Sequence, residues 1–205
     1  MAPTRLLVAG IGNIFLADDA FGPEVIAALR ERPLPAGADV RDFGIRGLDL
    51  AYQLLDGYDA VVLVDAAARG HRPGTLSLIA PELPDAADCA PEAHGMDPVK
   101  VLALAARLAE RPLPRVVLLA CEPERLPRDD TDVIDGLSAP VRAAVAAAVP
   151  LLHTVVRRLL SDPSAPLAFG RPEESGGCVP AGPCGIAARP EEDHHVRPSV
   201  SKEHA

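Results

Sequence analysis

Short apolar runs alternate with longer amphipathic segments along the first 160 residues of the chain. The runs are rich in β-branched residues, which is typical of strands that are buried on both faces of a sheet. We therefore predict an α/β fold with a single three-layer domain, in which helices flank a five-stranded sheet. The predicted strands are residues 4–9, 39–43, 60–64, 75–79 and 115–120.

The connection between the third and fourth predicted strands is short and turn-like. It spans residues 69–74 and contains two glycines and a proline, which mark turns. So short a connection favours a hairpin, because parallel neighbours need a longer crossover. We therefore expect a mostly parallel or mixed sheet in which the third and fourth strands pair with each other.

Capping residues and apolar spacing predict four helices. Asp97 followed by Pro98 is typical of a helix start, because proline is tolerated at the first helical position. Ser138 is predicted to cap the last helix, which Pro150 should kink or interrupt. The predicted helices are residues 23–30, 48–55, 98–110 and 139–160.

The composition changes after residue 160, where Pro, Gly, Ser, Glu and Arg dominate. Such a segment buries too little apolar surface to offset its ordering entropy. We predict one domain over residues 1–160 and a disordered tail over residues 161–205. The tail contains four residues of types that bind nickel, and a functionless extension is the alternative. These residues are Cys178, Cys184, His194 and His195.

The net charge of −9 excludes a general nucleic-acid-binding surface, since such a surface needs clustered basic residues and the chain has two lysines. The longest apolar stretch, residues 141–160, is interrupted by Arg142, Pro150 and His153, so we expect no membrane span. The apolar run near the N-terminus is too short for a signal peptide. We expect a cytoplasmic monomer with reduced thiols.

Acidic residues follow two of the predicted strands. Asp18 and Asp19 come after the first strand, and Asp65 comes directly after the third. Side chains at the carboxyl ends of strands in an open α/β sheet face the crevice where ligands bind. His94 precedes the Asp97 cap, and two carboxylates with one imidazole suit nickel, zinc or another divalent ion.

Each of these residues also has an ordinary structural explanation. An aspartate at a strand end often serves as a turn or capping residue, and Asp18 could cap the helix that follows it. A histidine before a helix often serves only as a hydrogen-bonded loop residue. The spacing of the three segments is not diagnostic of a metal site, so both interpretations stay open at this point.

Four motifs in order resemble the hydrogenase maturation endopeptidases, which process the large subunit of nickel-iron hydrogenases. The resemblance covers about Leu6 to Leu160. Its motifs are Gly10-Ile11-Gly12-Asn13 continuing through Asp18-Asp19-Ala20-Phe21-Gly22, then Asp42-Phe43-Gly44-Ile45-Arg46-Gly47, then Val61-Val62-Leu63-Val64-Asp65-Ala66 with Pro73-Gly74-Thr75, and finally His94 with Cys121-Glu122-Pro123.

The resemblance implies a role for three residues, Asp19, Asp65 and His94, as both the catalytic and the metal-contacting positions. Relatives often have Glu where Asp19 stands, and the ligand type is kept. The metal would be nickel supplied by the substrate, the hydrogenase large-subunit precursor, although zinc or cadmium could occupy the site in isolation. Cleavage would remove the C-terminal extension of the precursor after nickel insertion, either with metal assistance or with an aspartate as general base.

Two further residues have open assignments within this resemblance. Arg46 could hold a carboxylate of the substrate through its bidentate fork, or it could form a surface ion pair. Cys121 follows the fifth strand and could be a nucleophile, although a strand-end cysteine is more often an apolar filler.

Two other functions compete with an endopeptidase. A nucleotide-binding α/β domain would use the Gly10-x-Gly12 turn, but Phe15 stands where a small residue is needed. A non-catalytic nickel chaperone or assembly scaffold would use the cysteines and histidines of the tail.

Overall fold

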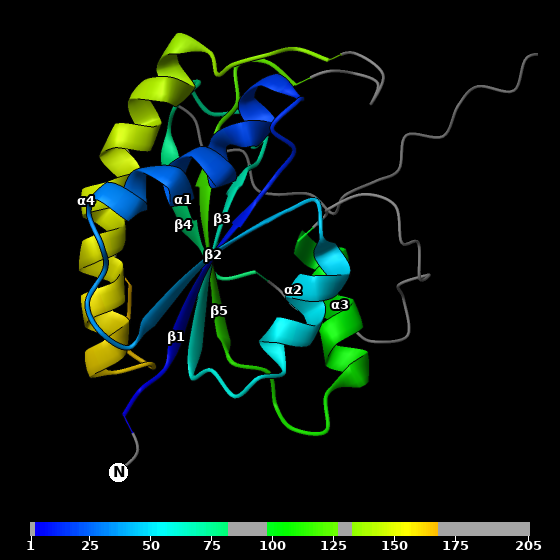
Figure 1. Ribbon diagram of the computed structural model, residues 1–205, viewed down its shortest axis with the longest axis vertical. Helices are drawn as coiled ribbons and strands as arrows, with labels where there is room; N and C mark the ends of the chain where they lie inside the picture. The colour runs from blue at the N-terminus through cyan, green and yellow to red at the C-terminus, as the bar shows by residue number, and fades with distance from the viewer. Residues whose placement is uncertain (1–2, 82–97, 127–132, 168–205) are drawn as a thin grey trace, which may run out of the picture. The chain divides into compact units, whose positions relative to one another are not determined.

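The computed structural model describes residues 3–81, 98–126 and 133–167, and Figure 1 shows its ribbon. The five predicted strands are all present, with ends that differ from the predictions by two residues or fewer. They are β1 (Leu6–Ile11), β2 (Ala38–Gly44), β3 (Ala60–Ala66), β4 (Leu76–Ile79) and β5 (Arg115–Cys121). The helices are the 3₁₀ helix η1 (Ala17–Ala20), α1 (Phe21–Glu31), α2 (Gly47–Leu54), α3 (Pro98–Leu108) and α4 (Ala139–Ser161).

The sheet is mixed and mostly parallel, with the strand order β2-β1-β3-β5-β4. β1 lies parallel to β2 and β3, and β5 lies parallel to β3. β4 pairs antiparallel with β5 at the edge. The α/β fold and the mixed sheet are therefore confirmed.

The predicted hairpin between the third and fourth strands is wrong, because β3 pairs with β1 and β5 rather than with β4. After β3 the chain passes across the end of β5, where the Ala67 N–H donates to the Cys121 carbonyl at 2.9 Å. It returns on the far side, where the Glu122 N–H donates to the Thr75 carbonyl at 2.9 Å. The turn was identified correctly, but β3 is a central strand with β1 and β5 as its neighbours, so β4 pairs with β5 at the edge of the sheet.

Two layers of helices cover the two faces of the sheet, as Figure 1 shows for α1 and α4 on one face and α2 and α3 on the other. Alternate residues of β1 point to opposite faces, as a strand requires. Leu6 and Val8 belong to the core beneath α1 and α4, and Leu7 and Ile11 belong to the core beneath α2 and α3. The predicted three layers follow from this alternation.

Helix α4 is continuous from Ala139 to Ser161, so Pro150 does not interrupt it. The residues on either side of the proline include Val149 and Leu152, which are buried, so packing maintains the helix despite the missing N–H. Among the described helices, α4 is long and apolar enough to cross a membrane, and 39% of its most apolar window is buried inside the fold. Its apolar side therefore contributes to the core of the domain.

The strand order reverses between β1 and β3. From β1 the chain crosses through α1 to β2 on one side, and it then returns through α2 to β3 on the other side of β1. In open α/β sheets, ligands bind beyond the carboxyl ends of the strands at such a topological switch point. The fold therefore selects one edge of the sheet, and one place on it, for a functional site. The predicted start of the disordered tail at residue 161 is wrong, because residues 161–167 pack on the domain: Ala165 is buried, and Arg115 donates to the carbonyls of Pro163 and Ala165. Residues 168–205 lie outside the described residues, so this part of the tail stays a prediction.

Candidate active site

Asp65 lies at the carboxyl end of β3, level with Ala120 of β5. Its side chain is 6% exposed, and its Oδ1 accepts the N–H of Ala66 at 2.8 Å. A carboxylate held this far from solvent is retained where hydrogen bonds or a cation offset its desolvation. The predicted position of Asp65 at the strand end is therefore correct, and the residue faces the edge selected by the topology.

Asp19 belongs to η1, which follows the turn after β1. Its Oδ2 accepts the N–H of Asn13 at 2.6 Å, a short hydrogen bond of the charge-assisted kind. Gly12 has a φ of +128°, and a Cβ at this position would lie 1.9 Å from the Asp19 carbonyl oxygen. Only glycine therefore allows η1 to pack so closely on the end of β1. The glycine turn serves to place Asp19.

Gly22, at the start of α1, packs directly against the ends of β1 and β3. A Cβ on Gly22 would lie 2.1 Å from the carbonyl oxygen of Ile11 in β1 and 2.4 Å from that of Val64 in β3. Helix α1 therefore begins directly on the carboxyl ends of the two strands that flank the switch point. Asp19 lies three residues before Gly22 and Asp65 directly follows Val64, so both carboxylates belong to this one place on the sheet.

His94, the third predicted ligand, and Asp97, the predicted helix cap, lie outside the described residues. Within the described part of the chain, no group of three or more His, Cys, Asp and Glu side chains could hold a metal. Asp19 and Asp65 alone supply two hard, anionic oxygen donors, which suit a divalent first-row ion that brings its other ligands with it. The assignment of His94 as a third ligand stays a prediction.

Asp18 has a structural role that differs from its neighbour's. Its side chain is fully buried, and its Oδ2 accepts the N–H groups of Glu124 at 2.9 Å and of Arg125 at 2.7 Å. Its Oδ1 accepts the N–H of Ser138, the residue before α4, at 2.7 Å. Asp18 therefore fixes the chain between β5 and α4 against η1. It does not cap the helix that follows it in sequence.

Glu122 plays a similar role for the segment after β3, whereas the sequence placed it in a motif without assigning it a role. Its side chain is buried, and its two carboxylate oxygens accept the N–H of Arg69 at 2.8 Å and of Gly70 at 3.2 Å. This segment begins two residues after Asp65. Glu122 therefore anchors the chain that leaves the site, and the signal that could have found it was an acid directly after a buried strand.

Arg46 is used by its own loop. Its Nε donates to the Phe43 carbonyl at 3.1 Å, a terminal nitrogen donates to the Asp42 carbonyl, and Asp49 lies 3.9 Å from the Nε. Of the two alternatives from the sequence, the ion pair is the one present. The guanidinium also donates to backbone carbonyls of its own loop, and its contact with a substrate carboxylate stays a prediction.

Cys121 is fully buried at the end of β5, in the core beneath α1 and α4. Burial, together with the nearby carboxylates of Asp18 and Glu122, raises the pKa of its thiol to about 12. A neutral buried thiol is a poor nucleophile, because the thiolate is the reactive form. Cys121 is therefore a small apolar filler of the core, as the more frequent alternative predicted.

We expect the Cys121 thiol of the folded protein to resist alkylation. At pH 8 its raised pKa keeps it protonated, and its burial excludes the reagent. Treatment with iodoacetamide followed by peptide mass mapping should show Cys121 unmodified until denaturant is added. Rapid modification in the native protein, or loss of activity in a stable Cys121→Ala variant, would contradict the filler role.

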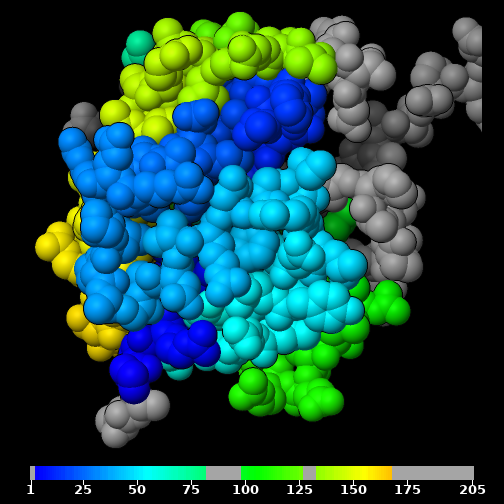
Figure 2. All heavy atoms as spheres, viewed as in Figure 1, coloured from blue at the N-terminus to red at the C-terminus, as the bar shows by residue number. Residues whose placement is uncertain are grey.

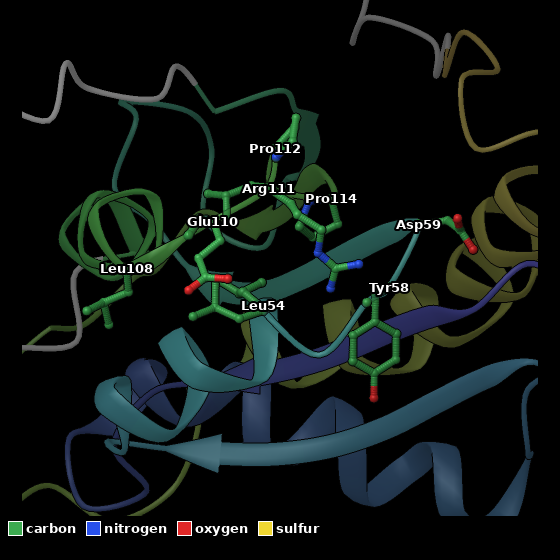
Figure 3. A pocket seen from close by; sticks show the side chains of 12 residues that line it. Leu54, Tyr58, Asp59, Leu108, Glu110, Arg111, Pro112 and Pro114 are labelled. Atoms are coloured by element: carbon green, nitrogen blue, oxygen red, sulfur yellow. The ribbon is translucent and has the colours of Figure 1, made fainter.

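A cavity of about 500 Å³ lies at the amino ends of the strands, at the other end of the sheet from Asp19 and Asp65, and Figure 3 shows its lining. Its walls come from the segment before β3, which includes Tyr58 and Asp59, and from the segment before β5, which includes Arg111 and Pro114. These segments lie at the amino ends of β3 and β5. The cavity is therefore separate from the carboxylates at the carboxyl edge.

Comparison with known proteins decides which family this arrangement belongs to. A sequence-family model described as hydrogenase maturation protease matches residues 23–155. The hydrogenase expression/formation protein HupD of Rhizobium leguminosarum is 33% identical over 181 residues, which cover 86% of this chain and 82% of HupD. The chain belongs to the hydrogenase maturation protease family.

Solved structures of maturation proteases share the fold. The hydrogenase maturating endopeptidase HybD of Escherichia coli is 27% identical with a TM-score of 0.58, over 75% of this chain and 93% of HybD. A hydrogenase 2 maturation peptidase of a Thaumarchaeota archaeon is 32% identical with a TM-score of 0.55, over 75% of this chain and 99% of its own. The family resemblance drawn from the sequence motifs is confirmed, and the chain is a member of an endopeptidase family rather than of a nucleotide-binding one.

Proposed function

We propose that this maturation protease removes the C-terminal extension of the large-subunit precursor of a nickel-iron hydrogenase, and that Asp19, Asp65 and His94 contact nickel carried by that precursor. One observation carries the proposal. Two carboxylates from separate segments, Asp19 after β1 and Asp65 on β3, come to the topological switch point of the sheet. A ligand is expected at this place, and anionic oxygens select a cation.

The donor set supports a metal that belongs to the substrate. Asp65 is buried, Asp19 is partly exposed, and the described residues supply no third ligand close by. Two carboxylates and one imidazole leave coordination positions open. A nickel ion already held by the precursor would bring the remaining ligands, so the protease would recognise the metal together with the protein that carries it.

The chemistry is peptide hydrolysis by water. Water adds to the scissile carbonyl carbon, and the amide nitrogen takes a proton and leaves as an amine. Nickel carried by the substrate would polarise the scissile carbonyl or lower the pKa of the attacking water. A carboxylate of the site would accept the proton that this water loses. Cys121, the cysteine nearest this edge among the described residues, is buried and protonated, so the described part of the site offers no thiolate for covalent catalysis.

The proposal predicts that cleavage depends on nickel in the precursor. A nickel-loaded precursor mixed with one hundredth of its amount of the protease should lose its C-terminal extension completely, as followed by intact mass, whereas the nickel-free precursor should stay intact. Many turnovers per protease molecule would exclude the chaperone alternative, because a chaperone cleaves nothing. Equal cleavage of both precursors would contradict nickel recognition.

A shortened chain tests the tail in the same assay. The truncation belongs after Leu167, because the Arg115 guanidinium donates to the carbonyls of Pro163 at 2.7 Å and Ala165 at 2.6 Å. If the truncated protease processes the precursor as fast as the full chain when nickel is limiting, the tail plays no part in nickel supply.

A further inference from the structure

Large apolar side chains gather around the carboxyl edge of the sheet. Among the described residues nine large apolar side chains are exposed, and six of them come from the three segments that border this edge. Phe15 is 58% exposed, Ile45 is 65% exposed and Val133 is 70% exposed. We call these six residues the apolar rim: Ile14, Phe15, Ile45, Leu48, Leu126 and Val133.

The segments of the apolar rim are joined by backbone hydrogen bonds. The Ile134 N–H donates to the Phe15 carbonyl at 3.0 Å, which ties the segment before α4 to the turn after β1. The Gly12 N–H donates to the Gly44 carbonyl at 3.1 Å, which ties the same turn to the last residue of β2, directly before Ile45. Figure 2 shows these segments on one face, with the dark blue chain after β1 beside the yellow-green chain before α4 and above the cyan chain after β2.

The central turn of the apolar rim is built on a carboxylate of the site. Asp19 accepts the N–H of Asn13 at 2.6 Å, and the Asn13 side-chain oxygen accepts the N–H of Phe15 at 3.0 Å. The Ile14 and Phe15 side chains therefore stand on a turn whose backbone is fixed, and their position relative to Asp19 is fixed with it. Apolar side chains presented on a rigid support lose little conformational freedom on binding.

Clustering of this kind is unusual on a protein surface. Single exposed apolar residues are common, but contiguous apolar patches mark binding surfaces. Aromatic side chains near the centre of such a patch carry much of the binding energy in protein complexes. The three other exposed residues are Tyr52 on α2 and Val99 and Leu108 on α3. Leu108 is at the end of α3 that leads to the amino end of β5, so it lies away from the rim.

We propose that the apolar rim is the docking surface for the folded part of the nickel-bearing precursor, an inference that rests on the proposed function. The bond to be cleaved must lie beside Asp19 and Asp65, so the protein surface next to that bond must meet the residues that border Asp19. Those residues are the apolar rim. The complementary surface of the precursor is therefore apolar around its nickel.

The chain's own tail is a poor occupant of this surface. Residues 168–205 contain five large apolar side chains, and these are separated by prolines, glycines and charged residues. A second copy of the chain is the other alternative, and the experiment below detects it.

The test compares serine substitutions inside and outside the rim. We expect Phe15→Ser and Ile45→Ser each to raise KM for the nickel-loaded precursor at least tenfold, with kcat within about twofold of the wild-type value, because docking rather than chemistry is weakened. Leu108→Ser, which is 43% exposed on α3, is the matched control and should leave KM unchanged. The unfolding midpoint of each variant checks that the fold is retained, since both rim side chains are exposed.

Three results separate the claims. A tenfold rise in KM for both rim variants but not for Leu108→Ser would support the docking surface. Unchanged KM in stable rim variants, or a wild-type dimer that Phe15→Ser converts to monomer, would overturn it. A wild-type protein that fails to cleave the loaded precursor would refute the proposed function itself, whatever the rim does.

Discussion

Replacing Asp19 or Asp65 by asparagine is expected to lower the processing rate of the nickel-loaded precursor on the order of a thousandfold. The side-chain volume is kept, and an asparagine oxygen can still accept the N–H that each carboxylate now accepts, from Asn13 in one case and from Ala66 in the other. The change therefore removes the negative charge and the anionic donor while leaving the local fold in place. The measurement is the rate of loss of the extension by intact mass.

Asp49 provides the matched control for these two variants. It is an exposed carboxylate in the first turn of α2, and it lies 3.9 Å from the Nε of Arg46. Helix α2 follows β2, so Asp49 is not at the switch point between β1 and β3. Asp49→Asn should process the precursor at the wild-type rate, because exposed ion pairs contribute little. Full activity in a correctly folded Asp19→Asn or Asp65→Asn variant would contradict the ligand assignment, and His94→Ala extends the same comparison to the third residue.

Asp18→Ala is expected to destabilise the domain by about 4 kcal/mol. Three backbone N–H groups, those of Glu124, Arg125 and Ser138, would lose a buried anionic acceptor together. Each unsatisfied buried donor costs about 1 to 3 kcal/mol, and the loss is a large share of the stability of a single domain. Urea unfolding of the variant and the wild-type protein measures the difference in the free energy of unfolding.

Asp135→Ala is the control for this substitution, because Asp135 is an exposed acid in the same segment before α4. It should change the free energy of unfolding by less than about 0.5 kcal/mol. If Asp18→Ala were as stable as Asp135→Ala, the three hydrogen bonds of Asp18 would not stabilise the packing of η1 against the chain between β5 and α4.

The elements of the fold could be predicted from the sequence because each depends on local pattern. The run from Ala60 to Val64 is apolar and β-branched, and it forms β3. The partner of β4 could not be predicted, because pairing depends on which strand lies beside it in the folded domain. The 3₁₀ helix η1 was also missed, since so short a helix has no periodic apolar pattern.

The part of the site that could be predicted is the part placed by the ends of strands. The positions of Asp65 and Asp19 at the carboxyl edge follow from the strand and turn before them. The anchoring role of Asp18 does not, because its hydrogen-bond partners lie 106, 107 and 120 positions away in sequence. The anchoring role of Glu122 was missed for a similar reason, since the N–H groups that it accepts are more than 50 positions away.

The central claim is that Asp19 and Asp65 contact nickel carried by the precursor, and the nickel itself can report this contact. X-ray absorption at the nickel edge, on rapidly frozen mixtures of the loaded precursor with the protease, would measure the ligands of the metal before cleavage is complete. We expect the nickel to gain oxygen or nitrogen ligands with the wild-type protein and to gain fewer with the Asp19→Asn and Asp65→Asn variants. A nickel environment that stays unchanged while the wild-type protease cleaves the precursor would contradict the account.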